Sequence, residues 1–171
     1  MRRVVVTGLG TINPLGNSVN TSWENLINSK SGISKITKFN VDTYPCKIAG
    51  SIEDSLINDE IVSLREQRKI DRFITLGLIA ANEAIVDSGF ISDEKSSLRS
   101  GVMVGSGIGG LDTIYKNSSV LDNQGIRKIS PFFIPSSLIN LLSGHISIKY
   151  DLKGPNSSPV TACATGTHAI G

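Results

Sequence analysis

Apolar residues along this chain alternate between short β-type runs and longer helical repeats. Residues 3–7 form a largely apolar, β-branched run closed by Gly-Leu-Gly, which is typical of a strand buried on both faces. A similar run at residues 100–105 predicts a second buried strand, and the segment that follows Gly154 and Pro155 predicts a third. Because helical patterns lie between these runs, we expect βαβ units and a largely parallel sheet covered by helices.

The first helical pattern covers residues 19–27, whose apolar side chains fall on one face. Thr21 and Glu24 have the spacing of a capping box, and Gly32 is a suitable helix stop. Residues 32–58 follow no regular period, which indicates an excursion from the core.

The clearest helix is predicted over residues 70–85, where apolar residues recur at helical spacing and Gly89 follows as a stop. A weaker helical pattern covers residues 111–121, and the polar residues 122–125 indicate a loop. Residues 135–146 open on Pro and Ser and continue with apolar residues, which predicts one further helix.

Composition narrows the class of protein. Of the 171 residues, 39% are hydrophobic and 19% are charged, which suits one globular domain with a buried core. A formal net charge of +2 gives little attraction for nucleic acid. No apolar stretch approaches the roughly 18 residues that span a membrane, and the first residues do not follow a signal-peptide pattern. We therefore expect a cytoplasmic protein that binds neither nucleic acid nor membrane.

The two cysteines lie far apart in the sequence, which favours reduced thiols over a disulfide. Cys46 lies in an irregular segment with no helix start, so its expected role is ordinary packing. No pair of Cys or His residues has the spacing of metal ligands, so no metal site is predicted.

Cys163 lies where a short β-type stretch meets small residues and then a helical pattern. A thiol in the first turn of a helix is close to unpaired backbone N–H groups and to the positive end of the helix dipole, both of which favour the nucleophilic thiolate. The small neighbours leave room for a substrate carbonyl and for N–H donors to an oxyanion. Taken alone, this position fits a buried structural cysteine at least as well as a catalytic one.

Residues 105–110, Gly-Ser-Gly-Ile-Gly-Gly, satisfy the G-x-G-x-x-G pattern of a dinucleotide site after a predicted strand. The segment after Gly110 is a poor helix, however, and no strand ending in an acidic residue follows at the distance needed to hold a ribose. A nucleotide-binding α/β oxidoreductase therefore stays as an alternative function.

Three motifs in order carry a family resemblance: residues 105–110, the Arg-Lys-Ile-Ser-Pro-Phe-Phe-Ile-Pro run at 127–135, and Thr-Ala-Cys-Ala-Thr-Gly around Cys163. Together they resemble the type II β-ketoacyl-acyl-carrier-protein synthases, the condensing enzymes of fatty-acid elongation, from the first predicted strand to the last residue. The resemblance implies an α/β, thiolase-like layered fold of which this chain supplies the first, incomplete half. Residues 1–171 would be an N-terminal domain that stops just after the nucleophile.

The resemblance implies that Cys163 accepts an acyl group from acyl carrier protein as a thioester. A malonyl unit on a second carrier protein would lose carbon dioxide and attack that thioester, and no cofactor is implied. In this family two histidines stabilise the charge that develops, but their motifs are not found in this sequence. His145 and His168 are therefore expected to pack or to bond backbone, and the 171 residues alone are not expected to elongate acyl chains.

The resemblance also implies a substrate pocket and a docking surface. Ile108 would line the acyl pocket, in a loop whose glycines allow close backbone approach. Phe133 and Ile134 would reach across the interface of a homodimer to line the partner's pocket. The cations implied in docking of the acidic acyl carrier protein are Arg65, Arg68 and Lys69, which fall at helical spacing on one face with Arg72.

Two further alternatives stay open beside the oxidoreductase. A polyketide-type ketosynthase or a thiolase relative would use other thioesters with the same thiol. A non-catalytic interaction subunit would keep the fold without the reaction.

Overall fold

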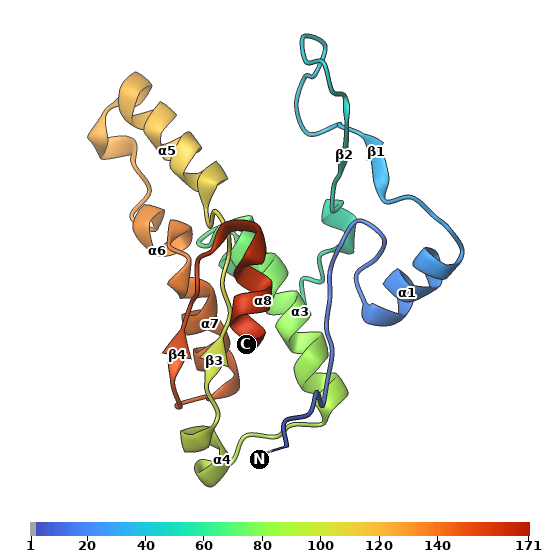
Figure 1. The fold of residues 1–171 in the computed structure, drawn as a ribbon. Helices are drawn as coiled ribbons and strands as arrows, with labels where there is room; N and C mark the ends of the chain where they lie inside the picture. Colours follow the sequence, from blue (N-terminus) through green and yellow to red (C-terminus); the bar gives the residue numbers. More distant parts are fainter. Residues whose placement is uncertain (1–2) are drawn as a thin grey trace. The chain divides into compact units, whose positions relative to one another are not determined.

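The computed structural model describes residues 3–171. The chain forms two compact units, one made of Met1–Ile61 and Ile79–Phe90, the other of Val62–Leu78 and Ile91–Gly171. Helix α3 (Arg72–Ser88) contributes its first residues to the second unit and its last residues to the first. Figure 1 shows the order of the elements along the chain.

The first unit holds helix α1, an antiparallel strand pair and a 3-10 turn besides its share of α3. Ser34 of one strand lies opposite Ala49 of the other, within the segment whose sequence is irregular. The elements are α1 (Val19–Ile27), β1 (Ile33–Lys35), β2 (Ile48–Gly50) and the 3-10 turn η1 (Asp54–Leu56).

The strand predicted at residues 3–7 is wrong. This segment and the residues after it are extended but pair with no other strand among residues 3–171, and the run is exposed to solvent. Carboxylates of α3 take the backbone N–H groups instead: Leu9 N donates to Asp87 Oδ2 at 2.8 Å, and Thr11 N donates to Glu83 Oε2 at 2.8 Å. β-branched residues favour extended backbone, but a strand also needs a neighbour.

Helix α1 begins differently from the prediction. Ser18 is its N-cap, and the Ser18 side chain accepts from Thr21 N at 3.1 Å, so the capping box expected at Thr21 and Glu24 is wrong. The helix ends at Ile27 with Asn28 as C-cap, before the predicted stop at Gly32. None of its residues is buried, although the amphipathic pattern is present.

The second unit carries most of the helices and a parallel strand pair. Its elements besides α3 are α2 (Leu64–Gln67), α4 (Glu94–Arg99), β3 (Val102–Met103), α5 (Leu111–Gln124), the 3-10 turn η2 (Ile126–Lys128), α6 (Phe133–Ser137), α7 (Asn140–Tyr150), β4 (Asn156–Ser157), the 3-10 turn η3 (Ala162–Ala164) and α8 (Thr165–Ile170).

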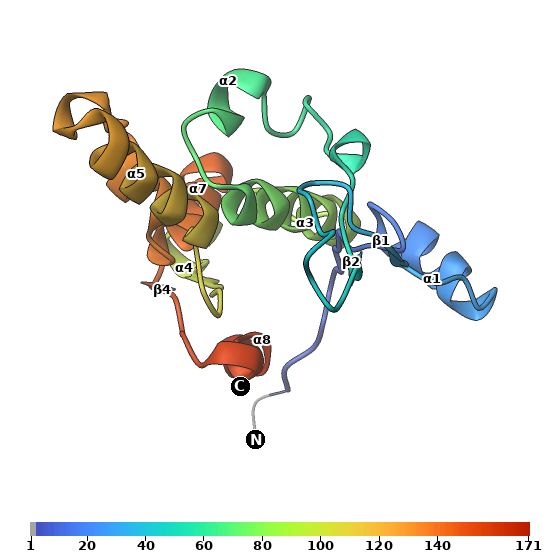
Figure 2. The ribbon, with the colours of Figure 1, turned by 90° about the horizontal axis from the view of Figure 1, so that it is seen from above.

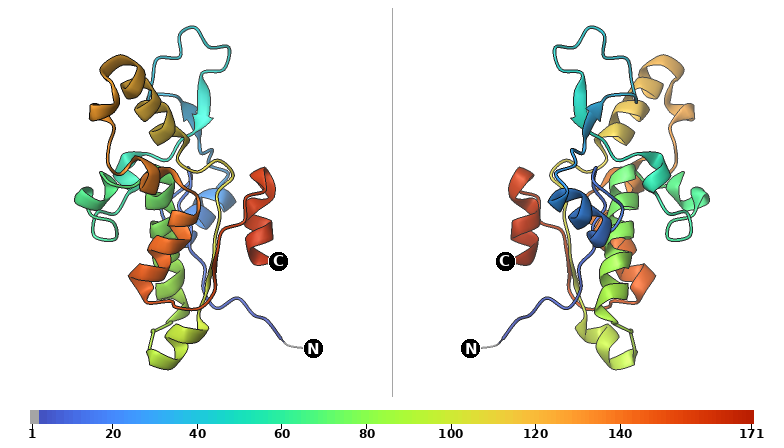
Figure 3. Two further views of the ribbon diagram at one scale, coloured as in Figure 1. Left: turned by 90° about the vertical axis from the view of Figure 1, so that its left-hand side faces the viewer. Right: turned by 90° about the vertical axis from the view of Figure 1, so that its right-hand side faces the viewer.

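Strands β3 and β4 confirm the predicted parallel pairing, in shorter form. Val102 lies opposite Asn156 and Met103 opposite Ser157. Figures 2 and 3 show this pair between α7 on one side and α8 on the other, which is a layered α/β arrangement. The parallel pair leads directly into the turn that holds Cys163.

The core of the second unit lies where α3 meets α7. A Cβ added at Gly77 would approach Leu142 Cδ1 to 2.5 Å, so the two helices can pack this closely only because Gly77 has no side chain. The buried apolar residues of this unit are Val62, Ile74, Leu78, Val102, Leu142, Ile146 and Leu152.

The helix predictions hold to different degrees in this part of the chain. Helix α3 confirms the strongest pattern, and Gly89 ends it with φ +63° as predicted. Helix α5 continues to Gln124, so the loop predicted at 122–125 is wrong up to Gly125, where the helix ends. The single helix expected at 135–146 is two helices, because the backbone at Leu138 is extended.

Candidate active site around Cys163

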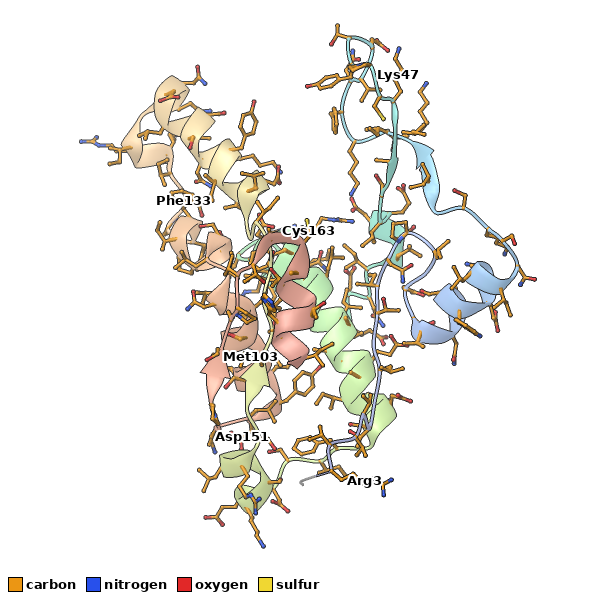
Figure 4. All side chains as sticks on the ribbon, viewed as in Figure 1. Arg3, Lys47, Met103, Phe133, Asp151 and Cys163 are labelled. Carbon is orange, nitrogen blue, oxygen red and sulfur yellow. The ribbon has the colours of Figure 1, made fainter. Side chains whose placement is uncertain are left out.

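Cys163 lies on an exposed turn at the end of the parallel strand pair. It belongs to η3, immediately before α8, rather than to the first turn of an α-helix as predicted. Its side chain is exposed and free, and Figure 4 shows it at the start of α8. A thiol in this place is reachable by a substrate from solvent.

The residue before the cysteine has an unusual backbone. Ala162 has φ +52°, the left-handed region that costs a non-glycine residue of order 1 kcal/mol. Such a conformation persists only where neighbouring contacts hold it. Ser29 and Asp151 share this conformation, so the positive φ supports a functional role of the turn only together with the exposed thiol that follows it.

Two threonines and a histidine hold this turn. Thr165, which is only 4% exposed, accepts from Thr161 N at 2.9 Å and donates to Ala162 O at 2.7 Å through its hydroxyl. His168 Nδ1 lies 2.7 Å from Thr161 Oγ1. Neither threonine is predicted from the sequence. His168 was expected to pack or to bond backbone, whereas its partner is a side-chain hydroxyl.

The glycine-rich loop at 105–110 lies against the same turn. A Cβ at Gly105 would collide with the carbonyl oxygen of Pro159, and one at Gly107 would lie 3.0 Å from Ala162 O. The expected close backbone approach is confirmed, and it explains these glycines without a pyrophosphate. Ile108 belongs to the same loop, and 67% of its surface is exposed.

Replacing Gly105 with alanine is expected to cost roughly 2 kcal/mol of unfolding free energy, because the added methyl group would force Pro159 and the cysteine turn to move. Chemical denaturation measures this cost. Gly144→Ala is the matched control, since a Cβ there meets nothing within 4 Å and alanine favours the helix. Equal stability of the two variants would contradict the close approach.

Asp71 is a buried carboxylate that the sequence analysis missed. It is 7% exposed and accepts from Phe73 N at 3.1 Å, from Thr113 N at 3.1 Å and from Thr113 Oγ1 at 2.5 Å. Its own N–H donates to Ser136 O at 3.3 Å. Asp71 therefore connects the starts of α3 and α5 with α6. An acid just before a helical pattern is a cap signal that could have revealed it.

The two remaining residues expected in the acyl pocket lie on α6. Phe133 is half-buried, and its carbonyl oxygen accepts from Ser136 Oγ at 3.0 Å and from Ser137 Oγ at 2.8 Å. Ile134 is 56% exposed. The peptide N–H of Gly110 donates to Ser137 O at 3.1 Å, so α6 is joined to the end of the glycine-rich loop that carries Ile108.

The basic residues do not form the continuous helical stripe that was expected. Helix α2 holds Arg65 and ends at Gln67, Arg68 is its C-cap, and Arg72 belongs to the next helix, α3. Arg65, Arg68 and Lys69 are exposed. Lys69 Nζ lies 5.4 Å from the centre of the Phe132 ring, a cation–π distance.

Cys46 is exposed, so its predicted packing role is wrong; its thiol donates to Ile48 O at 3.3 Å. His145 on α7 is half-buried, as expected for a packing residue. Burial lowers the pKa of His145, and the nearby Glu66 carboxylate opposes that shift.

Within residues 3–171, no cluster of three or more His, Cys, Asp or Glu side chains could hold a metal ion. In the same residues, no helix has the length and apolar character to cross a membrane.

Comparison with known proteins places this geometry in a family. The family described as Beta-ketoacyl synthase, N-terminal domain, matches residues 1–171. The chain is 49% identical to 3-oxoacyl-[acyl-carrier-protein] synthase 2 of Coxiella burnetii, over 99% of this chain and 41% of that protein. It thus spans about two fifths of that relative's length.

Solved structures share the fold. A β-ketoacyl synthase from Burkholderia phymatum superimposes with a TM-score of 0.79 at 23% identity, over 99% of this chain and 42% of that one. A ketosynthase solved with its type II polyketide acyl-carrier protein and a hexaketide gives 0.73 at 26% identity, over 100% of this chain and 45% of that one. The thiolase-like layered fold and the resemblance are both confirmed: this chain belongs to the β-ketoacyl synthase family and matches its N-terminal domain.

Proposed function

We propose that this chain is the acyl-accepting part of a 3-oxoacyl-[acyl-carrier-protein] synthase II, which elongates fatty acids by Claisen condensation. The observation that carries the proposal is the exposed Cys163 on a strained turn, placed against a glycine-rich loop in a chain of this family. Relatives named for this activity support the same function. The proposal concerns the whole protein, of which these residues supply the nucleophile.

The first half-reaction needs only a thiolate and room for a thioester. The Cys163 sulfur attacks the acyl carbonyl, the carbon–sulfur bond to the carrier breaks, and the carrier thiol leaves with a proton. Ala162 and Ala164 flank the nucleophile and leave its approach open. The N–H groups of Ala164 and Thr165 already donate to Thr161 O and Ala162 O, so the Cys163 N–H is the candidate donor of this turn to the oxyanion.

The second half-reaction breaks a carbon–carbon bond of malonyl carrier protein. Carbon dioxide leaves, the electron pair stays on the thioester enolate, and this carbanion attacks the Cys163 thioester to release the sulfur and a β-ketoacyl product. The enolate oxygen needs donors, and in this family the donors are two histidines whose motifs this sequence does not contain; His168 Nδ1 lies against Thr161 Oγ1, and His145 is on α7. We therefore expect no elongation by these 171 residues alone.

Ile108, Phe133 and Ile134 are proposed to line the acyl pocket. Ile108 and Ile134 expose apolar surface and Phe133 is half-buried, on a loop and a helix that are hydrogen-bonded to each other, and this arrangement supports the role. Burial of an alkyl chain is worth about 0.8 kcal/mol per methylene, so a lining of this kind would set chain length by its depth. Phe133 and Ile134 would line the pocket of the partner subunit across a homodimer interface.

We also propose a cytoplasmic location, because the two cysteines are free thiols and cytosolic proteins keep their thiols reduced.

The acyl carrier protein is the proposed partner of Arg65, Arg68 and Lys69. These cations are exposed, and a ketosynthase of the same fold has been solved with its own carrier protein. These cations would attract an acidic carrier protein, and salt would weaken the attraction because it screens the charges.

Reversing charge at Arg68 and Lys69 together, by Arg68→Glu and Lys69→Glu, is expected to weaken carrier-protein binding about tenfold or more and to flatten its salt dependence. Fluorescence anisotropy with labelled carrier at several salt concentrations measures both effects. Lys95→Glu, on the exposed surface of α4, is the matched control and should bind nearly as the wild type does. Unchanged binding of the double variant would refute the docking role.

The activity itself is tested by incubating the natural protein with one carrier protein that holds an acyl group and another that holds a malonyl group. The β-ketoacyl product is then measured. Condensation is expected with carrier thioesters and much less with coenzyme A thioesters. Equal or faster turnover of coenzyme A thioesters would favour a thiolase-type relative, and no product with either would contradict the proposal.

A further inference from the structure

A small basic cavity lies between the end of α2 and the start of α5. Its volume is about 160 Å³. The side chains that line it are Arg68, Lys69, Ile70, Thr113, Lys116, Asn117, Ser130, Phe132 and Ser136. Three of them are cations and none is an acid, so the cavity concentrates positive potential in one place.

Three of the four neutral polar side chains of the cavity already donate a hydrogen bond within the protein, and the hydroxyl of the fourth, Ser130, accepts from Phe132 N at 3.2 Å. The Thr113 hydroxyl donates to Asp71, Asn117 Nδ2 donates to Thr113 O at 2.9 Å, and Ser136 Oγ donates to Phe133 O. The donors left for an incoming group are therefore mainly the three cations. An anion is the ligand class that such a lining selects.

The three cations differ in how they are held. Lys69 Nζ lies over the Phe132 ring, 5.4 Å from its centre, and this cation–π contact favours a position at the cavity wall. Arg68 has no ion pair within residues 3–171. Lys116 Nζ is 2.5 Å from Asp112 Oδ2, one helical turn away on α5, and both side chains are more than 60% exposed. Such an exposed pair is weak and can exchange partners.

We propose that this cavity receives a carboxylate of the acidic carrier protein, and that Lys116 is a docking cation which leaves Asp112 to bind it. The inference rests on the carrier-dependent function proposed above and extends its docking surface from α2 to α5. Asp112 then acts as an internal competitor: it holds Lys116 when the carrier is absent and weakens binding by the strength of that pair.

The competition predicts opposite effects of two substitutions on one helix. Lys116→Gln removes a cation and is expected to weaken binding of apo carrier protein about threefold to tenfold. Asp112→Asn frees Lys116 and is expected to strengthen binding about twofold to fivefold, with the gain shrinking at high salt. The measurement is the Kd of labelled apo carrier for the natural protein, at low and high salt.

Matched controls separate the cavity from overall charge. Lys153→Gln removes a lysine from another exposed ion pair, and Asp122→Asn removes an exposed acid from the same helix as Asp112. Neither residue lines the cavity, so both variants should change Kd less than twofold. Circular dichroism checks that α5 is retained in every variant.

The inference is overturned if Lys116→Gln binds as the wild type does, if Asp122→Asn strengthens binding as much as Asp112→Asn, or if the wild type does not bind the carrier. It is also overturned if duplex DNA binds with the same dependence on Lys116, since the cavity would then be a general polyanion site. Condensation activity is measured separately. Activity that persists while Lys116 proves inert would leave the proposed function standing and remove only this cavity.

Discussion

Replacing Cys163 with alanine is expected to lower the rate of condensation by at least roughly 10³-fold, because no other group in the turn can hold the acyl chain as a thioester. The loss should fall on turnover rather than on carrier binding, since the cations of the docking surface are untouched. Product formation from acyl and malonyl carrier proteins measures the rate, and anisotropy measures the binding.

Cys46→Ala is the matched control for this prediction. Cys46 is the other free, exposed thiol of the described chain, and it belongs to the first unit rather than to the turn before α8. The Cys46→Ala enzyme should keep wild-type turnover. A Cys163→Ala enzyme that condenses within tenfold of the wild type would remove Cys163 from the mechanism.

Asp71→Asn is expected to lower the free energy of unfolding by about 3 kcal/mol. The amide would keep the shape of the carboxylate but only one of its two acceptor oxygens, so it could not accept both from Phe73 N and from Thr113, and leaving buried donors unsatisfied costs about 1–3 kcal/mol each. Chemical denaturation gives the value. The double variant with Thr113→Val should lose less than the sum of the two single variants, because the two residues share one interaction.

Asp122→Asn is the control for Asp71. It removes a carboxylate from the exposed surface of α5 and should change stability by less than about 0.5 kcal/mol. If Asp71→Asn cost no more than this, the carboxylate would not connect α3 and α5 as described.

Local patterns were enough to predict the parts of the fold that depend on short stretches of chain. Helix α3 follows its apolar period and ends at Gly89, where the positive φ suits glycine. The β3–β4 pairing followed from two β-type runs separated by helices. Cys163 was expected in the first turn of a helix and lies in η3, just before α8. The prediction came this close because small residues between a strand and a helix leave few alternatives.

The predictions that failed depended on partners far away in the sequence. Residues 3–7 have strand-forming side chains but pair with no strand among residues 3–171, and just after them Leu9 N and Thr11 N donate to Asp87 and Glu83 of α3. Asp71 and Thr113 meet only in the folded chain, so no local pattern joins them. The roles of Cys163 and of the pocket residues came from the family motif, since the same cysteine taken alone fits a structural role equally well.

The most direct test is to find where the acyl group goes. The natural protein is incubated with a fatty acyl carrier protein and no malonyl substrate, digested, and examined by tandem mass spectrometry. The acyl mass is expected on the peptide that contains Cys163, and it should disappear on addition of malonyl carrier protein as product forms. An acyl group carried by Cys46, or condensation that proceeds with Cys163 never acylated, would contradict the central claim.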